Sequence, residues 1–127
     1  MQTAAHMSNH PDARSAVLTK AVLRAADQLG VRSKSLSAVI GVSEPTVSRM
    51  RKGGFLLEPD TKPFELGILF VRLFRSLDAI VGGDERVAKS WLTNENSAIG
   101  ARPIDKIQTI AGLIDVIAYL DARRAII

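Results

Sequence analysis

From Leu36 to Gly53 the chain reads Leu-Ser-Ala-Val-Ile-Gly-Val-Ser-Glu-Pro-Thr-Val-Ser-Arg-Met-Arg-Lys-Gly. This is the spacing of two short helices that cross at a wide angle, because the small Ser37 stands where the second helix would pack and Gly41 can form the turn. Apolar residues recur at positions that face one shared seam, namely Leu36, Ile40, Val42, Val47 and Met50. The stretch therefore predicts a helix-turn-helix.

The second helix of this motif carries polar and charged side chains on the face opposite the seam. In a helix-turn-helix that face enters the major groove of DNA, and cations beside the groove attract phosphates. We expect base edges to be faced by Ser43, Glu44, Ser48 and Arg49, phosphates to be contacted by Arg51 and Lys52, and Thr46 to be a further DNA-contacting residue. The alternative interpretation is an ordinary helix hairpin whose basic face is only solvated.

The distribution of charge supports the DNA interpretation independently of the motif. The chain of 127 residues has a formal net charge of +4. Residues 1–59 hold eight basic and four acidic side chains, and residues 60–127 hold nine of each. The positive charge is therefore concentrated in the half that carries the motif, and the neutral half is expected to have a different task.

Composition argues against several classes of protein. With no cysteine, the chain has no disulfide, no cysteine-based zinc site and no thiol nucleophile. The apolar segment 64–81 is interrupted by charged residues too often for a membrane span. The polar N-terminus shows no signal peptide, so we expect a cytoplasmic protein.

Nothing in the sequence has the arrangement of an active site. No nucleophile stands beside a base, and both Gly-Gly pairs fall at predicted helix ends rather than in a phosphate-binding loop. His6 and His10 lie in an N-terminal tail, residues 1–13, that we expect to be disordered, and they have no partners for a metal site. We therefore expect no enzymatic activity, no cofactor and no metal.

Helical periodicity recurs along the chain and strand signals are nearly missing, so the predicted fold is all-α. A first helix, closed by Gly30, precedes the motif, and the helix-turn-helix domain is expected to span residues 14–59. A long helix from about Thr61 to Val81, with Thr61 or Asp60 as its cap and Gly82-Gly83 at its end, then opens a second helical domain, residues 60–127. Apolar residues cover most of this long helix, so we expect other helices and a second copy of the chain to bury it.

The remaining helices are predicted from caps and apolar faces. Asp84 would cap a helix whose inward face is formed by Val87, Ala88, Trp91 and Leu92. Residues 93–101 form a loop, and Arg102-Pro103 begins a short helix buried by Ile104 and Ile107. Gly112 is expected to break the chain before a last helix that buries Leu113, Ile114, Ile117, Ala118 and Leu120.

The second half resembles the MbcA/ParS/Xre antitoxin family, over roughly the last 65 residues of the chain. The resemblance rests on a succession of short motifs in the expected order: Trp91-Leu92, Asn96, Ile99-Gly100, Arg102-Pro103, Asp105 and Gly112. Two positions depart from the family pattern, since Ser97 follows the asparagine and Ala101 precedes the arginine. The geometry of this loop is therefore expected to differ locally.

The resemblance implies an antitoxin that represses its own operon and neutralises a RES-domain toxin, an enzyme that consumes NAD or transfers ADP-ribose. It implies two partners, the toxin and double-stranded operator DNA. We also expect a homodimer, because a single helix-turn-helix makes few contacts and the long helix has excess apolar surface. A stand-alone dimeric transcription regulator is the alternative, because it would share the DNA-binding half. A neighbouring gene for a RES protein would distinguish the two.

We expect toxin contacts at the last helix and tail, where an aromatic ring, cations and apolar residues are combined as at interfaces. The expected toxin-binding residues are Arg102, Tyr119, Arg123, Arg124, Ile126 and Ile127. Each has a plain alternative: Arg102 could form a salt bridge at a helix start, and the tail could be a frayed, solvated terminus. Trp91 is expected to be a core anchor rather than a contact residue.

Overall fold

The computed structural model describes the backbone of residues 12–126 and the side chains of residues 12–125. Within that range the fold is all-α, as predicted, with seven helices and no strand beyond one isolated bridge between Asn96 and Ala101. The helices are α2 (Ala13–Leu29), α3 (Ser33–Ile40), α4 (Glu44–Arg51), α5 (Lys62–Val81), α6 (Glu85–Thr93), α7 (Pro103–Lys106) and α8 (Ile110–Ile126).

The N-terminal tail expected over residues 1–13 lies outside the described residues up to residue 11, and so do His6 and His10. Asp12 caps α2 by accepting a hydrogen bond from the backbone N–H of Arg14 at 2.8 Å. Ala13 is already helical. Asp12 and Ala13, the last two residues of the segment that we expected to be disordered, are therefore ordered.

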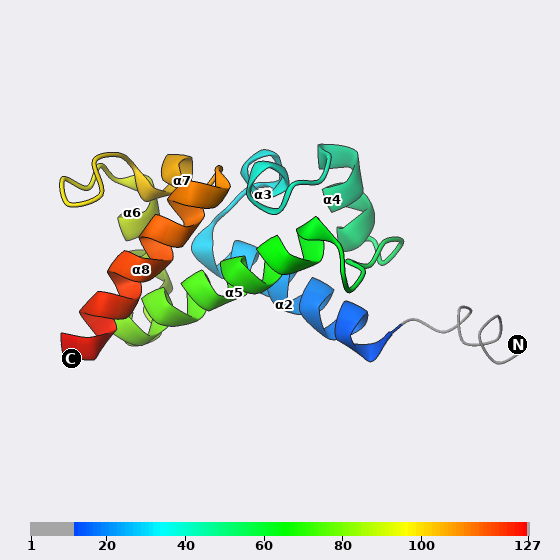
Figure 1. Cartoon of the computed structure of the whole chain (residues 1–127), viewed down its shortest axis with the longest axis horizontal. Helices are drawn as coiled ribbons and strands as arrows, with labels where there is room; N and C mark the ends of the chain where they lie inside the picture. The colour runs from blue at the N-terminus through cyan, green and yellow to red at the C-terminus, as the bar shows by residue number, and fades with distance from the viewer. Residues whose placement is uncertain (1–11, 127) are drawn as a thin grey trace, which may run out of the picture.

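Helices α3 and α4 form the predicted helix-turn-helix (Figure 1). Gly41 ends α3 in the left-handed region, with a φ of 74°, a conformation that side chains with a Cβ rarely adopt. The predicted seam is confirmed: Leu36, Ile40, Val47 and Met50 are buried and Val42 is partly buried. Local signals were sufficient here because the turn and both helices lie within a short stretch of chain.

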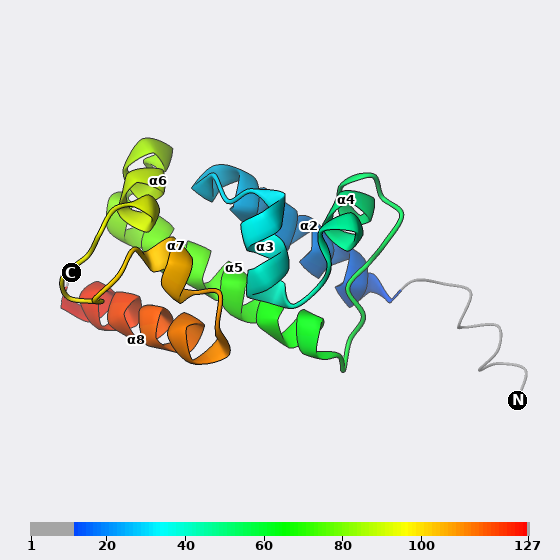
Figure 2. The same ribbon diagram turned by 90° about the horizontal axis from the view of Figure 1, so that it is seen from above.

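Helix α5 is the longest of the described helices and crosses the middle of the molecule, with α6 near its last residue (Figures 1 and 2). Thr61 caps it and Gly82 ends it, both as predicted. At Gly67 a Cβ would lie 3.2 Å from Val22 and 3.3 Å from Leu57, so this glycine allows the helix to approach α2 and the preceding loop closely. The buried hydroxyl of Thr19 holds that loop by accepting the N–H of Leu57 at 2.9 Å.

One hydrophobic core extends through both predicted halves. Helix α5 packs against α2 on one side and α8 on another, and α2 also packs against α6. Buried side chains continue from Val22 in α2 through Phe70 in α5 to Leu120 in α8. The core is therefore continuous across residues 59 and 60, and the domain division there remains a prediction.

The start of α8 was predicted wrongly. Gly112 does not break the chain but lies in the first turn of α8, where a Cβ would be 1.8 Å from the carbonyl oxygen of Lys106. The glycine is thus needed because the end of α7 crosses the helix at this point. Sequence periodicity does not carry information about such a crossing.

Two of the predicted inward faces also need correction. In α8, Ile114 is 50% exposed and Ala118 is exposed, whereas Val116, which we did not predict, is fully buried. In α6, Val87 is 49% exposed, and the core side is formed by Ala88 and Leu92. Each of these helices is covered by the rest of the protein on one face only, so Ile114 and Val87 face outward.

Candidate functional site

The start of helix α4 is built by its own side chains. The hydroxyl oxygen of Ser43 accepts a hydrogen bond from the backbone N–H of Thr46 at 3.1 Å, which is the usual role of a serine cap. Pro45 occupies the first turn, where its missing N–H costs no hydrogen bond. Ser43, Glu44 and Ser48 are exposed, as a groove-facing surface requires.

Thr46 and Arg49 are coupled on this helix. Thr46 is only 8% exposed, and its hydroxyl lies 2.9 Å from that of Ser43 and accepts a hydrogen bond from the Arg49 guanidinium at 3.0 Å. The same guanidinium lies over the ring of Phe55, 5.8 Å from its centre. Arg49 is therefore held in place before it meets any partner, and Thr46 contributes by positioning it.

The two cations at the end of α4 have different surroundings. Arg51 donates a hydrogen bond to the Asp27 carboxylate of α2 at 2.9 Å. Lys52 is exposed at the C-cap, and among residues 12–125 it makes no ion pair. A negative ligand could therefore attract Lys52 directly, whereas Arg51 is shared with Asp27.

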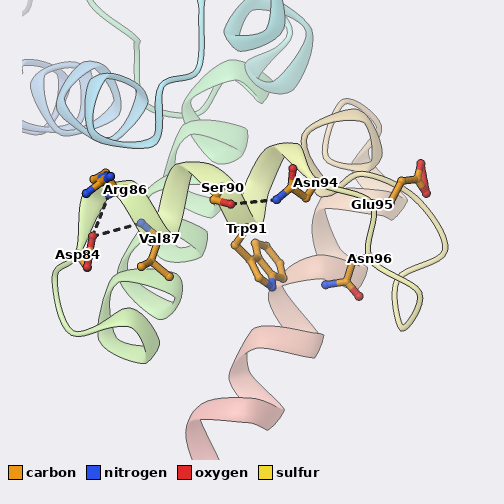
Figure 3. Close-up of a pocket in the computed structure, with 8 residues that line it drawn as sticks. All are labelled: Asp84, Arg86, Val87, Ser90, Trp91, Asn94, Glu95 and Asn96. Carbon is orange, nitrogen blue, oxygen red and sulfur yellow. Dashed lines mark hydrogen bonds between the residues drawn. The ribbon is translucent and has the colours of Figure 1, made fainter.

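At the opposite end of the molecule, α8 is fastened to α6 by aromatic stacking. The rings of Trp91 and Tyr119 are 6.3 Å apart and inclined by 16°, and in Figure 3 the Trp91 ring extends from α6 toward α8. The Arg123 guanidinium donates a hydrogen bond to the Tyr119 hydroxyl at 3.2 Å and lies 5.9 Å from the ring centre. Trp91 is partly buried, so it anchors α8 while part of the ring remains exposed.

The last turns of α8 are also held by a polar network with α5. Ser76 is fully buried; it donates a hydrogen bond to Asp121 at 2.9 Å and accepts one from Arg124 at 3.2 Å. Arg72 forms an ion pair with the same carboxylate. The hydrogen bond from Ser76, helped by Arg72 and Arg124, lowers the pKa of Asp121 below its usual value.

Sequence models of two antitoxin domains match the chain. The antitoxin Xre-like helix-turn-helix domain matches residues 8–72, and the antitoxin Xre/MbcA/ParS C-terminal toxin-binding domain matches residues 76–125. The chain belongs to the Xre antitoxin family. It is therefore an antitoxin of a toxin–antitoxin system, with a DNA-binding half and a toxin-binding half. A search of the curated proteins gave no match.

The boundary between the two matches falls inside α5, between residues 72 and 76. In this antitoxin, Arg72 belongs to the helix-turn-helix match and Ser76 to the toxin-binding match, yet both contact Asp121. These α5 residues were not among those predicted from the sequence. The available signal was a serine and an arginine one turn apart in an otherwise apolar segment, but only the fold supplies their partner.

Arg102 of the antitoxin forms a salt bridge at the start of a helix, which was the alternative to a toxin contact. Its guanidinium forms hydrogen bonds of 2.9 and 3.1 Å with Asp105, one turn into α7. This pairing raises the pKa of Arg102 and lowers that of Asp105. The group remains exposed, so its toxin contact stays a prediction, as do those of Ile127 and the Ile126 side chain, which lie outside the described residues.

The loop between α6 and α7 contains a turn that is held by Asn96. The Asn96 side chain accepts the N–H groups of Ala98 and Ile99 at 3.0 and 3.3 Å, and Gly100 has a φ of 83°. Beside it lies an open hollow of about 480 Å³, shown in Figure 3. It is lined by Asp84, Arg86, Val87, Ser90, Trp91, Asn94, Glu95 and Asn96.

Two features are absent from the described residues. They contain no group of three or more histidine, cysteine or acidic side chains that could hold a metal ion. None of their helices is long and apolar enough to cross a membrane.

Proposed function

We propose that this antitoxin neutralises a RES-domain toxin, which consumes NAD or transfers ADP-ribose, by covering the entrance to the toxin's NAD site. The observation that carries the proposal is the double anchoring of the end of α8, through Tyr119 on Trp91 and through Arg124 on Ser76. An anchored helix end needs little ordering when a partner binds, so less free energy is lost in forming the complex. The inhibition needs no chemistry of the antitoxin's own.

Once a neighbouring gene for a RES-domain protein is found, an NAD-consumption assay with that protein tests the proposal. Deleting residues 123–127 from the full chain should relieve inhibition more than it weakens DNA binding, because the tail lies far from α4. Arg24→Ala, which removes an exposed arginine from α2, is the control and should inhibit fully. Full inhibition by the deletion variant, folded by circular dichroism, would move the toxin contact away from the terminus.

The full chain is the appropriate protein for this assay. A fragment that begins at residue 60 would lose α2, which packs against both α5 and α6. Its failure to bind toxin could then reflect unfolding rather than a missing contact. Comparing variants of the intact antitoxin avoids this ambiguity.

We further propose that the antitoxin binds its operator and represses its own operon as a homodimer, because one helix-turn-helix makes few contacts and two copies would match a two-fold site. An apolar groove of about 800 Å³ between α2 and α5 supports the dimer. On this groove Val17 is 69% exposed and Ile68 is 49% exposed. A second copy of the chain would remove both side chains from water.

Light scattering of two matched variants tests the dimer. Ile68→Asp should convert the protein to a monomer and weaken operator binding. Val87→Asp changes an equally exposed apolar residue on α6 and should leave the mass unchanged. A monomeric wild-type protein that occupies a single half-site would refute the dimer.

A further inference from the structure

A basic hollow lies at the junction of the helix-turn-helix with the toxin-binding half. It has a volume of about 490 Å³ and is lined by residues of α2, α3, α4 and α6. Three cations from three different helices or caps line it: Arg32 at the N-cap of α3, Arg51 at the end of α4 and Lys89 in α6. Asp27 is the acidic residue of the lining, so the lining is net positive.

Lys89 reaches this hollow across the turn between α2 and α3. The turn is formed by Gly30, with a φ of 69°, and a Cβ there would lie 3.3 to 3.5 Å from the Cγ, Cδ and Cε atoms of Lys89. The aliphatic part of the lysine thus packs on the backbone of the DNA-binding half. Its ammonium group is 3.9 Å from the Glu85 carboxylate, a loose and solvent-exposed pair that a stronger anion can replace.

The position of the hollow points to a particular anion. In helix-turn-helix proteins the first helix of the motif crosses the DNA backbone while the second enters the major groove. Here Arg32 and Ser33, at the start of α3, and Arg51, at the end of α4, line the hollow. A duplex engaged by α4 is therefore expected to bring its phosphates toward the start of α3 and so toward this hollow.

We propose that Lys89 contacts a phosphate of the DNA that α4 binds, together with Arg32 and Arg51. The residue belongs to the match with the toxin-binding domain, so the DNA surface extends beyond the helix-turn-helix. The phosphate would replace Glu85 as the partner of Lys89. This inference rests on DNA binding by α4, and the experiment separates the two.

The test measures binding of the full chain to a mixed-sequence DNA duplex across a series of salt concentrations. Lys89→Met keeps an unbranched apolar chain over Gly30 but removes the charge. It should lower by about one the magnitude of the salt slope, which is the slope of the logarithm of the binding constant against the logarithm of the salt concentration. Lys89→Arg keeps the charge and should retain the slope. Lys20→Met is the matched control, because Lys20 is an exposed lysine that lines a different hollow, between α2 and α5.

The outcomes are distinct. A lower slope in Lys89→Met alone, with an unchanged melting temperature, supports the phosphate contact. An unchanged slope in Lys89→Met, while the wild-type protein binds with a normal slope, overturns the Lys89 contact and leaves DNA binding by α4 intact. If the wild-type protein binds no duplex, including its own promoter region, both the contact and DNA binding by α4 fail.

Discussion

Arg49 shows how a neighbouring side chain prepares a contact residue. Sequence periodicity placed it on the open face of α4, and it is exposed there. Periodicity did not reveal that the Thr46 hydroxyl is buried and accepts its hydrogen bond, or that Phe55 lies beneath it. Those contacts depend on how the cap and the following loop fold back, which a one-dimensional pattern does not contain.

Arg49 and Lys52 are expected to act differently on DNA. Arg49→Ala should cost about 1 to 3 kcal/mol on the operator and relax sequence preference, since a held guanidinium suits a base edge. Lys52→Ala should weaken operator and random duplex similarly and lower the salt slope by about one, as for a phosphate contact. Titrations on both duplexes across salt concentrations measure this; unchanged affinity in both variants would contradict the assignment.

Asp121 should give the protein a pH-dependent contribution to stability. Its pKa is lowered by Ser76 and Arg72, so the folded state favours the ionised carboxylate. That contribution is present above the usual pKa of 3.8 and is lost as the pH falls through the lowered value. Asp121→Asn should therefore lower the melting temperature at pH 7, and the difference from wild type should shrink below about pH 3.8.

Asp115→Asn is the matched control for this measurement. Asp115 is an exposed acid on the same helix, and its carboxylate is 3.9 Å from Lys106. Thermal melts of both variants at neutral and acid pH should separate them. A constant difference for Asp121→Asn at every pH would mean that the residue acts through packing alone.

At the scale of elements, the caps were predictable and the positions of helix crossings were not. Thr61, Asp84 and Gly82 end or begin their helices as expected because each acts within a turn of its own position. The start of α8 was misplaced because position 112 requires glycine for another reason: a Cβ there would clash with the carbonyl oxygen of Lys106, across the α7–α8 connection. The same misplacement shifted the predicted inward face of α8.

Gly112→Ala should destabilise the protein although alanine is the better helix former. The new Cβ would meet a backbone oxygen at 1.8 Å, so α7 and α8 must separate, and overpacking of this kind costs about 1 to 3 kcal/mol or more. Gly54→Ala is the control, since its Cβ would have a nearest neighbour at an ordinary 3.7 Å. Urea denaturation of both variants measures the difference; equal midpoints would show that the crossing adjusts freely.

At the scale of the whole molecule, charge distinguished a basic half from a neutral half but gave no sign that the two family matches meet within one helix. The family matches meet within α5, and buried side chains continue from α2 to α8. Nothing in the sequence marks a helix as common to two domains, because its apolar faces look the same whichever helices cover them. The toxin-binding half therefore lacks an independent core.

A shared core predicts one unfolding transition. The chain has a single tryptophan, Trp91, and it lies in the toxin-binding half, so its fluorescence reports that half. Far-ultraviolet circular dichroism reports all helices. The two thermal transitions should coincide, and a fluorescence midpoint well separated from the circular dichroism midpoint would show that the halves unfold independently.

The shared helix α5 has a consequence for how the cell disposes of the antitoxin. A protease that captures the unfolded chain removes the DNA-binding half and the toxin-binding half in the same event, because a shared core is expected to leave no folded fragment of either half. Under the proposed function, loss of this protein therefore releases the toxin and its promoter together. DNA binding and toxin binding are therefore expected to be lost in equal proportion, since both depend on the folding of α5.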